Sequence, residues 1–196
     1  MNLEVKGNKD NSNFTVIGPA HSGKSTFGKQ YIELGYTYLA LDNLVSEVPL
    51  KDEVIKFFEI DYYKEFNDLQ IKILNNLYTL INKGNNKFVF DDILNYVDKD
   101  IKRQVTKSLD RKGIKFINIT SNIEEVLLTD YLVVLYQENI VLEGKTLEVL
   151  KEEKIIRKLG LSLPFIVDIS IQLQYYGLID KIYLDNDELV CELWKL

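Results

Sequence analysis

Residues 18–25 read Gly-Pro-Ala-His-Ser-Gly-Lys-Ser. This is the spacing G-x-x-x-x-G-K-[ST] of the P-loop, a turn whose backbone N–H groups cradle phosphate oxygens. The apolar run at residues 14–17 precedes it and predicts a strand, and residues 26–34 after it predict a helix. Strand, glycine-rich loop and helix are the context that the motif requires. The stretch therefore predicts a nucleotide-phosphate site at a helix N-terminus, where the helix dipole favours negative charge.

Each residue type in this loop has a physical role. Lys24 is expected to reach the β- and γ-phosphates as a point charge, and the Ser25 hydroxyl is expected to ligate Mg²⁺. His21 is the only histidine of the chain, and we interpret it as a loop residue within reach of phosphate rather than a catalytic base. The residues predicted to bind nucleotide are Gly18, Pro19, Ala20, His21, Ser22, Gly23, Lys24, Ser25 and Thr26.

Length and composition limit the possibilities. A chain of 196 residues with 46% hydrophobic residues suits one globular domain, alone or with a small appendage. The net charge of −6 argues against a nucleic-acid partner. The single cysteine, Cys191, excludes an internal disulfide and is predicted to be buried. The polar N-terminus shows no signal peptide, and no apolar window is long enough for a membrane span, so we expect any membrane link to come through a partner.

The rest of the chain alternates between strand and helix patterns. Strands are predicted at residues 37–41, 87–90, 114–119, 131–136 and 140–142, and helices at 51–58, 63–83, 98–112 and 124–128. From Thr146 the tail is mostly helical. This order predicts an α/β fold with a mainly parallel sheet flanked by helices. We expect a P-loop nucleotide-binding domain over residues 1–145, with a reduced helical insert at about 44–84, and a helical C-terminal region over 146–196.

A pair of carboxylates supplies the second half of the site. Asp91 and Asp92 follow the apolar run at residues 88–90, and ligands in open α/β sheets sit at the carboxyl ends of strands. P-loop nucleotide enzymes need an acidic residue there for Mg²⁺. We assign Asp91 to the metal and Asp92, one residue on, to polarising water as the catalytic carboxylate, with Lys24 as its catalytic partner.

The block from Phe88 to Gly144 resembles the second half of an ABC-transporter ATPase domain in the order and spacing of its motifs. The Walker B strand ending at Asp91 is followed by Ile-Thr-Ser-Asn-Ile-Glu-Glu-Val at residues 119–126 and by two short strands ending in a glycine. The tail stretch Leu-Gly-Leu-Ser-Leu-Pro-Phe at residues 159–165 resembles the C-terminal region of the ATPase subunits of energy-coupling-factor (ECF) transporters.

This resemblance implies an ABC-type P-loop NTPase fold with a reduced helical subdomain. It also implies ATP and Mg²⁺ as ligands, a second ABC ATPase subunit in a homodimer or heterodimer, and a membrane transporter component as partners. The location that it implies is cytoplasmic, peripheral on the inner face of the cell membrane.

Several positions depart from the family pattern. Ser121 stands where the family has its switch histidine, and Asp92 replaces the catalytic glutamate with a side chain one methylene shorter. Residues 66–70 read Phe-Asn-Asp-Leu-Gln instead of Leu-Ser-Gly-Gly-Gln, so that only Gln70 matches. Asp42 is the nearest candidate for the Q-loop glutamine. Because neither water activation nor γ-phosphate contact has its usual form, we expect an ATPase with weak or partner-dependent hydrolysis.

Two other functions remain open. One is a nucleotide-binding module that does not hydrolyse ATP and acts as a structural or regulatory subunit. The other is a P-loop small-molecule kinase, which would need a lid arginine from Arg103, Arg111 or Arg157. The aromatic segment at residues 57–66 is expected to be packing surface, and it is also our candidate for docking to a membrane partner.

Overall fold

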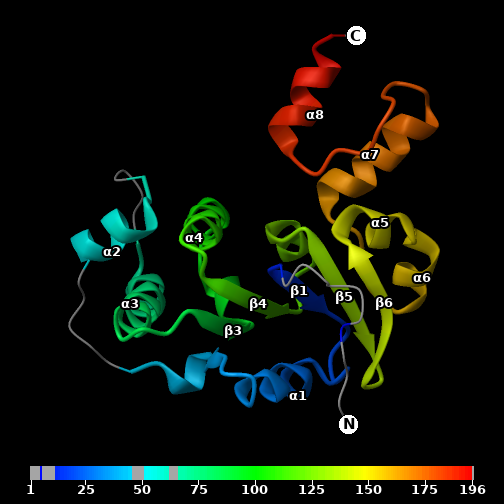
Figure 1. Cartoon of the computed structure of the whole chain (residues 1–196). Coiled ribbons are helices and arrows are strands. Elements are labelled where there is room, and N and C mark those ends of the chain that lie inside the picture. Colours follow the sequence, from blue (N-terminus) through cyan, green and yellow to red (C-terminus); the bar gives the residue numbers. More distant parts are fainter. Residues whose placement is uncertain (1–4, 6–11, 46–50, 62–65, 196) are drawn as a thin grey trace.

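The structure is a computed structural model, and it describes residues 5, 12–45, 51–61 and 66–195. A central sheet carries helices on both faces, and a helical C-terminal region extends from one end of the sheet (Figure 1). Residues 63–65 of the helix predicted at 63–83, and residues 62–65 of the aromatic segment, lie outside the described residues.

Six strands form the sheet in the order β2-β3-β4-β1-β5-β6. Their bounds are β1 (Phe14–Ile17), β2 (Thr37–Leu39), β3 (Lys87–Asp91), β4 (Lys115–Thr120), β5 (Tyr131–Tyr136) and β6 (Asn139–Lys145). The first five strands in this order are parallel, and β6 pairs antiparallel with β5. The predicted α/β fold with a mainly parallel sheet is confirmed. The central strands are buried on both faces, which explains why they read as continuous apolar runs.

The strand register brings the candidate site together. Ile17 pairs with Thr120 and Asp91 pairs with Ile119, so β1, β3 and β4 end at the same edge of the sheet. The residues that follow these ends are the P-loop after β1, Asp92 after β3 and Ser121 after β4. Segments distant in sequence thus meet at the carboxyl edge of a parallel sheet.

The helices lie between and after the strands. The α-helices are α1 (Lys24–Lys29), α2 (Lys51–Phe58), α3 (Asp68–Asn82), α4 (Lys99–Arg111), α5 (Thr146–Lys151), α6 (Glu153–Lys158), α7 (Phe165–Tyr175) and α8 (Asn186–Leu193). The 3-10 helices are η1 (Gln30–Ile32), η2 (Leu41–Asn43), η3 (Ile93–Tyr96) and η4 (Ile123–Leu128). The helix predicted at 26–34 therefore starts earlier and tightens at Gln30, and the short helix predicted at 124–128 has 3-10 geometry.

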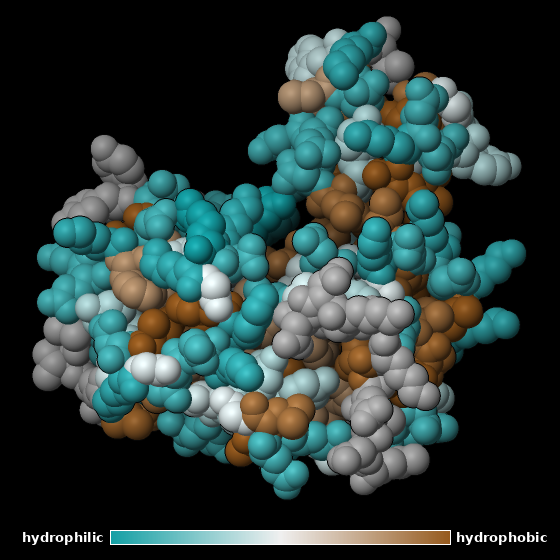
Figure 2. Space-filling model, in the orientation of Figure 1, coloured by the Kyte–Doolittle hydropathy of each residue, from teal (hydrophilic) through white to brown (hydrophobic). Residues whose placement is uncertain are grey.

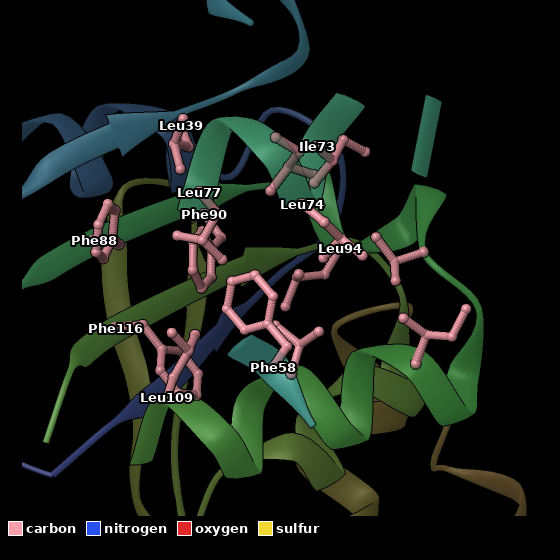
Figure 3. Packing of buried hydrophobic residues seen from close by; sticks show 14 of the residues in the cluster. Leu39, Phe58, Ile73, Leu74, Leu77, Phe88, Phe90, Leu94, Leu109 and Phe116 are labelled. Atoms are coloured by element: carbon pink, nitrogen blue, oxygen red, sulfur yellow. The ribbon is translucent and has the colours of Figure 1, made fainter. Parts of the chain in front are cut away.

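A large hydrophobic cluster joins α2, α3 and α4 to β2, β3 and β4. Figure 3 shows Phe88 and Phe90 of the sheet facing Leu74 and Leu77 of α3, with Phe58 of α2 between the layers. Phe58 and Leu74 are fully buried. The helices of the predicted insert thus pack on the sheet, and the described part of the aromatic segment serves this core, as predicted for a packing surface.

The C-terminal region has its own cluster, which joins α5, α6 and α7 to η4 and β5. Polar links to the rest of the fold include the Phe165 N–H, which donates to Glu124 (2.7 Å), and the pair of Arg103 with Asp185 (2.7 Å). Helices α5 and α6 lie against the sheet, whereas α7 and α8 stand out from the rest of the molecule (Figure 2). Cys191 on α8 is exposed, so the prediction that it is buried was wrong. The apolar neighbours that suggested burial sit on a short helix with few contacts to the rest of the fold.

Candidate nucleotide site

The P-loop turns tightly at the end of β1. A side chain at Gly18 would place its Cβ 2.3 Å from the Leu135 carbonyl oxygen, so only glycine fits. Gly23 directly precedes α1 and has a φ of 91°, in the left-handed region that glycine adopts without strain. The loop is therefore shaped by its two motif glycines, and it presents the N-terminal N–H groups of α1 toward its interior.

Lys24 bridges the mouth of this loop. Its ammonium donates hydrogen bonds to the carbonyl oxygens of Gly18 and Pro19, both at 2.8 Å. Burial lowers the pKa of Lys24, and the nearby carboxylates of Asp92 and Asp91 oppose that shift. The ammonium is thus partly removed from water and held by two neutral acceptors. A phosphate oxygen would be a stronger partner for it than either carbonyl.

An unpaired hydroxyl lies inside the loop. Ser22 is 2% exposed, and its Oγ has no hydrogen-bond partner within the described part of the chain. A buried hydroxyl without a partner costs free energy, so such groups generally mark a place for a ligand or an ordered water. With the glycine cradle and the Lys24 ammonium, this hydroxyl makes the loop a good fit for a phosphate group.

The metal donors predicted from sequence face one another across the edge of the sheet. Ser25 opens α1 and Asp91 ends β3, and both are linked to the Tyr38 hydroxyl: Tyr38 donates to Asp91 Oδ2, and it shares a hydrogen bond with Ser25. A hydroxyl and a carboxylate are hard oxygen ligands of the kind that Mg²⁺ takes alongside substrate phosphates. This donor set fits Mg²⁺ held together with a bound nucleotide.

Asp92 points away from Asp91 toward β4. Its backbone is left-handed, with a φ of 53°. Its Oδ1 accepts hydrogen bonds from the Ser121 N–H (3.0 Å), the Ser121 hydroxyl (3.2 Å) and the Asn95 amide (2.7 Å). The two positions that depart from the family pattern are therefore direct partners, and one oxygen of the catalytic candidate is saturated by the protein itself.

The degenerate signature position lies at the start of α3. Asn67 caps this helix: its side chain accepts from the Gln70 N–H (2.8 Å), and the Gln70 side chain accepts from the Asn67 N–H (3.1 Å). This reciprocal capping box occupies the backbone N–H groups of Asn67 and Gln70, which an uncapped helix would leave free to bind a ligand. Gln70 is buried in this arrangement. It belongs to the first turn of α3, and the structure does not bring it to the P-loop.

Two further candidates lie at the margin of the site. Asp42 is exposed in η2, close enough to Tyr38 to raise the pKa of that phenol together with the larger effects of burial and Asp91. His21 is exposed at the tip of the P-loop, with a φ of 58°. Asp92 accepts three hydrogen bonds from its neighbours, whereas no such set of hydrogen bonds fixes the side chain of Asp42 or His21 in the described part of the chain.

Three contributors were not found from the sequence: Tyr38, Asn95 and the β5–β6 turn. The Glu138 N–H of that turn donates to the Ser22 carbonyl oxygen (3.0 Å) and so fastens the hairpin to the P-loop. Finding Tyr38 and the turn requires the strand order, because the pairing of β2 with β3 and of β1 with β5 brings them to the site. Asn95 lies only three residues after Asp92, in η3, and reaches it locally.

Solved structures with the same arrangement are ABC ATPases. CbiO1 from Clostridium perfringens, part of the ABC transporter complex CbiONQ, has a TM-score of 0.56 and 17% identity, over 79% of this chain and 85% of that chain. A bacterial Atm1-family ABC exporter with ATP bound has a TM-score of 0.56 and 14% identity, over 76% of this chain and 36% of that chain. The fold is that of an ABC ATPase domain, as predicted.

The sequence narrows the likeness further. EcfA1, an ECF transporter ATP-binding protein of Mesomycoplasma hyopneumoniae (strain 7448), is 35% identical over 112 residues, which cover 55% of this chain and 40% of the relative. EcfA of Methanosarcina acetivorans is 33% identical over 92 residues, 45% of this chain and 33% of the relative. The chain thus matches well under half the length of these curated relatives. No protein-family model matches it. The resemblance to ECF transporter ATPases is confirmed over about half of this chain.

Proposed function

We propose that this chain is an ABC-type ATPase subunit of the ECF class, which binds ATP with Mg²⁺ and works with a second ATPase subunit and a membrane component. The observation that carries the proposal is the P-loop, where a buried hydroxyl with no partner among the described residues and a partly desolvated ammonium converge on one cradle. The names of the sequence relatives support the transporter role. Such a subunit would lie on the cytoplasmic face of the membrane, and within the described residues no helix is both long and apolar enough to cross it.

The chemistry that ATP–Mg²⁺ supplies when bound is transfer of its γ-phosphoryl group to water. Lys24 would exchange the two loop carbonyls for phosphate oxygens, while Ser25 and Asp91 would hold the cation. To Asp92 we assign the task of taking a proton from water. Its Oδ1 is already committed to Ser121 and Asn95, which leaves Oδ2 for that task. These roles give firm nucleotide binding and slow hydrolysis.

The second ATPase subunit follows from the capped end of α3. In the ABC family two subunits sandwich two nucleotides, and the signature motif of one faces the γ-phosphate held by the other. In this chain the capping box of Asn67 and Gln70 and the negative charge of Asp68 oppose that contact. We infer that the partner provides the signature motif and this chain provides the P-loop.

The proposal is tested by nucleotide binding and turnover. We expect ATP with Mg²⁺ to bind the wild type and to lose about 100-fold in affinity in Lys24→Ala, since charged hydrogen bonds to phosphate are worth about 3 kcal/mol. Lys107→Ala, on the exposed face of α4, is the matched control and should bind as the wild type does. The proposal is wrong if ATP affinity does not depend on Lys24.

Turnover is measured for the chain alone and mixed with candidate ATPase partners. Asp92→Asn should keep ATP affinity within about twofold and lower turnover at least tenfold, since a general base contributes about 10²-fold or more. Association with a membrane component is tested by copurification from cells that express the candidate transporter subunits.

A module that binds ATP without hydrolysis is the second candidate. The three hydrogen bonds to Asp92 Oδ1 favour it, because they restrain the carboxylate to which we assign the catalytic role. Tight ATP binding with no turnover, alone and with every partner, would select this function. The kinase is disfavoured: Arg103, Arg111 and Arg157 are each paired with carboxylates outside the site, at 2.6–2.8 Å.

A further inference from the structure

Tyr38 connects the two metal donors, although no motif assigns it a role. It lies on β2, the edge strand beside β3, with Tyr38 paired to Val89. From there its hydroxyl donates to Asp91 Oδ2. The ring packs beneath α1, with the Lys29 ammonium 5.9 Å from the ring centroid. The ring is therefore held between helix and sheet, and only the hydroxyl enters the site.

The direction of the hydrogen bonds can be deduced. The Tyr38 hydroxyl donates its proton to Asp91 Oδ2, and the same hydroxyl is hydrogen-bonded to the side chain of Ser25. A phenol has a single proton to donate, and its oxygen can also accept. Because that proton goes to Asp91, the Ser25 hydroxyl donates to Tyr38. The three groups form a directed chain from Ser25 through Tyr38 to Asp91.

This direction suits a cation site. A serine that ligates a cation offers an oxygen lone pair and must turn its proton elsewhere, and Tyr38 accepts that proton. On the other side Tyr38 occupies only one of the two carboxylate oxygens of Asp91. The other oxygen can then face the cation or its water. Both donors are oriented before any ligand arrives.

We propose that Tyr38 is a positioning residue for the metal half of the nucleotide site, where its hydroxyl sets the orientation of the Ser25 hydroxyl and the Asp91 carboxylate. The proposal rests on the proposed function as an ATP–Mg²⁺ site. It assigns Tyr38 a task that depends on the cation and not on the phosphates. Hydrogen-bond partners of metal ligands commonly change metal affinity by about 10- to 100-fold when removed.

The test is ATP affinity of the full chain, measured by calorimetry in excess Mg²⁺ and again in EDTA. We expect Tyr38→Phe, which keeps the packed ring, to weaken binding about tenfold in Mg²⁺ and by less than about twofold in EDTA. Tyr36→Phe is the matched control, because this half-buried tyrosine packs edge-on against Tyr31. It should match the wild type in both conditions, and thermal unfolding checks that both variants fold.

A double-mutant cycle separates positioning from packing. In an Asp91→Ala background, where only the Ser25 contact remains, Tyr38→Phe should cost no more than about threefold in Mg²⁺. Equal affinity of Tyr38→Phe and wild type in Mg²⁺, or an equal loss in Mg²⁺ and EDTA, overturns the Tyr38 proposal and leaves the ATP site intact. Failure of the wild type to bind ATP in a Lys24-dependent way overturns both.

Discussion

The two halves of the candidate site treat their polar groups in opposite ways. In the binding half, made of the P-loop and Asp91, Ser22 Oγ has no partner among the described residues and Lys24 rests on two neutral carbonyls. In the hydrolysis half, made of Asp92 with Ser121 and Asn95, the protein satisfies its own groups with internal hydrogen bonds. The first turn of α3, which stands apart from the P-loop, is closed in the same way by its capping box. The first half is prepared for a ligand, whereas the second half is already occupied by its neighbours.

The internal hydrogen bonds of Asp92 predict how strongly hydrolysis is slowed. Each hydrogen bond to a charged group contributes roughly 1.5–3 kcal/mol. Turning the Asp92 carboxylate so that Oδ2 reaches water would release Oδ1 from donors on its other side, and the loss of two of its three hydrogen bonds would cost about 3 kcal/mol or more. A cost of about 3 kcal/mol in the barrier slows a reaction about 100-fold. The comparison therefore predicts that binding and turnover respond to different substitutions.

Gly18→Ala should have the largest effect. Its Cβ would lie 2.3 Å from the Leu135 carbonyl oxygen and 2.5 Å from Ser22 Oγ, so the cradle must distort. We expect ATP affinity to fall about 100-fold, the order of magnitude expected when charged phosphate hydrogen bonds are lost. Gly84→Ala is the control, since a Cβ there meets no atom within 4 Å. An unchanged ATP affinity in Gly18→Ala would remove the basis for a preformed binding half.

The second-largest effect on ATP affinity is expected from alkaline pH. Burial lowers the pKa of Lys24, so it loses its charge below the pH at which an ordinary lysine does. ATP affinity should therefore fall as the pH rises through that lowered pKa, by about tenfold per pH unit above it until the lysine contribution is gone. Nearby phenols do not interfere, since burial raises the pKa of Tyr31 to about 12 and also raises that of Tyr38. Lys24→Arg should shift the fall to higher pH, and an identical profile would contradict the assignment.

Asn67→Ala should affect folding and leave binding alone. It removes the side-chain cap of α3, which accepts from the Gln70 N–H at 2.8 Å. The expected loss is about 1 kcal/mol in the free energy of unfolding, measured by denaturant titration. ATP affinity should stay within about twofold of wild type. Asn82→Ala, exposed in the last turn of the same helix, is a control for asparagine loss. A large change in ATP affinity would mean that α3 contributes to the binding half.

Ser121→Ala should have the smallest effect, and whether ATP turnover rises or falls tells what Ser121 does. It removes one hydroxyl donor to Asp92 Oδ1 (3.2 Å), while the backbone N–H of the same residue (3.0 Å) remains. Where turnover is measurable with a partner, we expect a rise of about twofold, since Asp92 is held less firmly. A fall would show that Ser121 acts on the phosphate itself, in place of a histidine.

The sequence was informative where a local pattern determines a local structure. The P-loop spacing predicted the turn at Gly18 and a helix after the loop, which begins two residues earlier than predicted, and apolar runs predicted every strand of the sheet. The apolar run that leads into two acidic residues predicted the carboxylates Asp91 and Asp92 at the carboxyl end of β3. These features depend on residues close together in the chain.

Features that depend on strand order were not predictable in the same way. Nothing near Thr37–Leu39 indicates that β2 lies beside β3, so the contact between Tyr38 and Asp91 was not foreseen. The Asp92–Ser121 pair likewise needs the register of β3 against β4. The exposure of Cys191 was missed because apolar periodicity does not tell whether a helix face meets the core.

The turn between β5 and β6 has a consequence for protein engineering. Gln137 and Glu138 are exposed at the tip of a hairpin, which is ordinarily a favoured place for a peptide tag or a fluorescent insertion. Here the backbone N–H of Glu138 is bonded to the Ser22 carbonyl oxygen, and a Cβ at Gly23 would come within 3.0 Å of the Glu138 side chain. An insertion at this tip would loosen the phosphate cradle from a distant point in the sequence, so a reporter belongs elsewhere on the molecule.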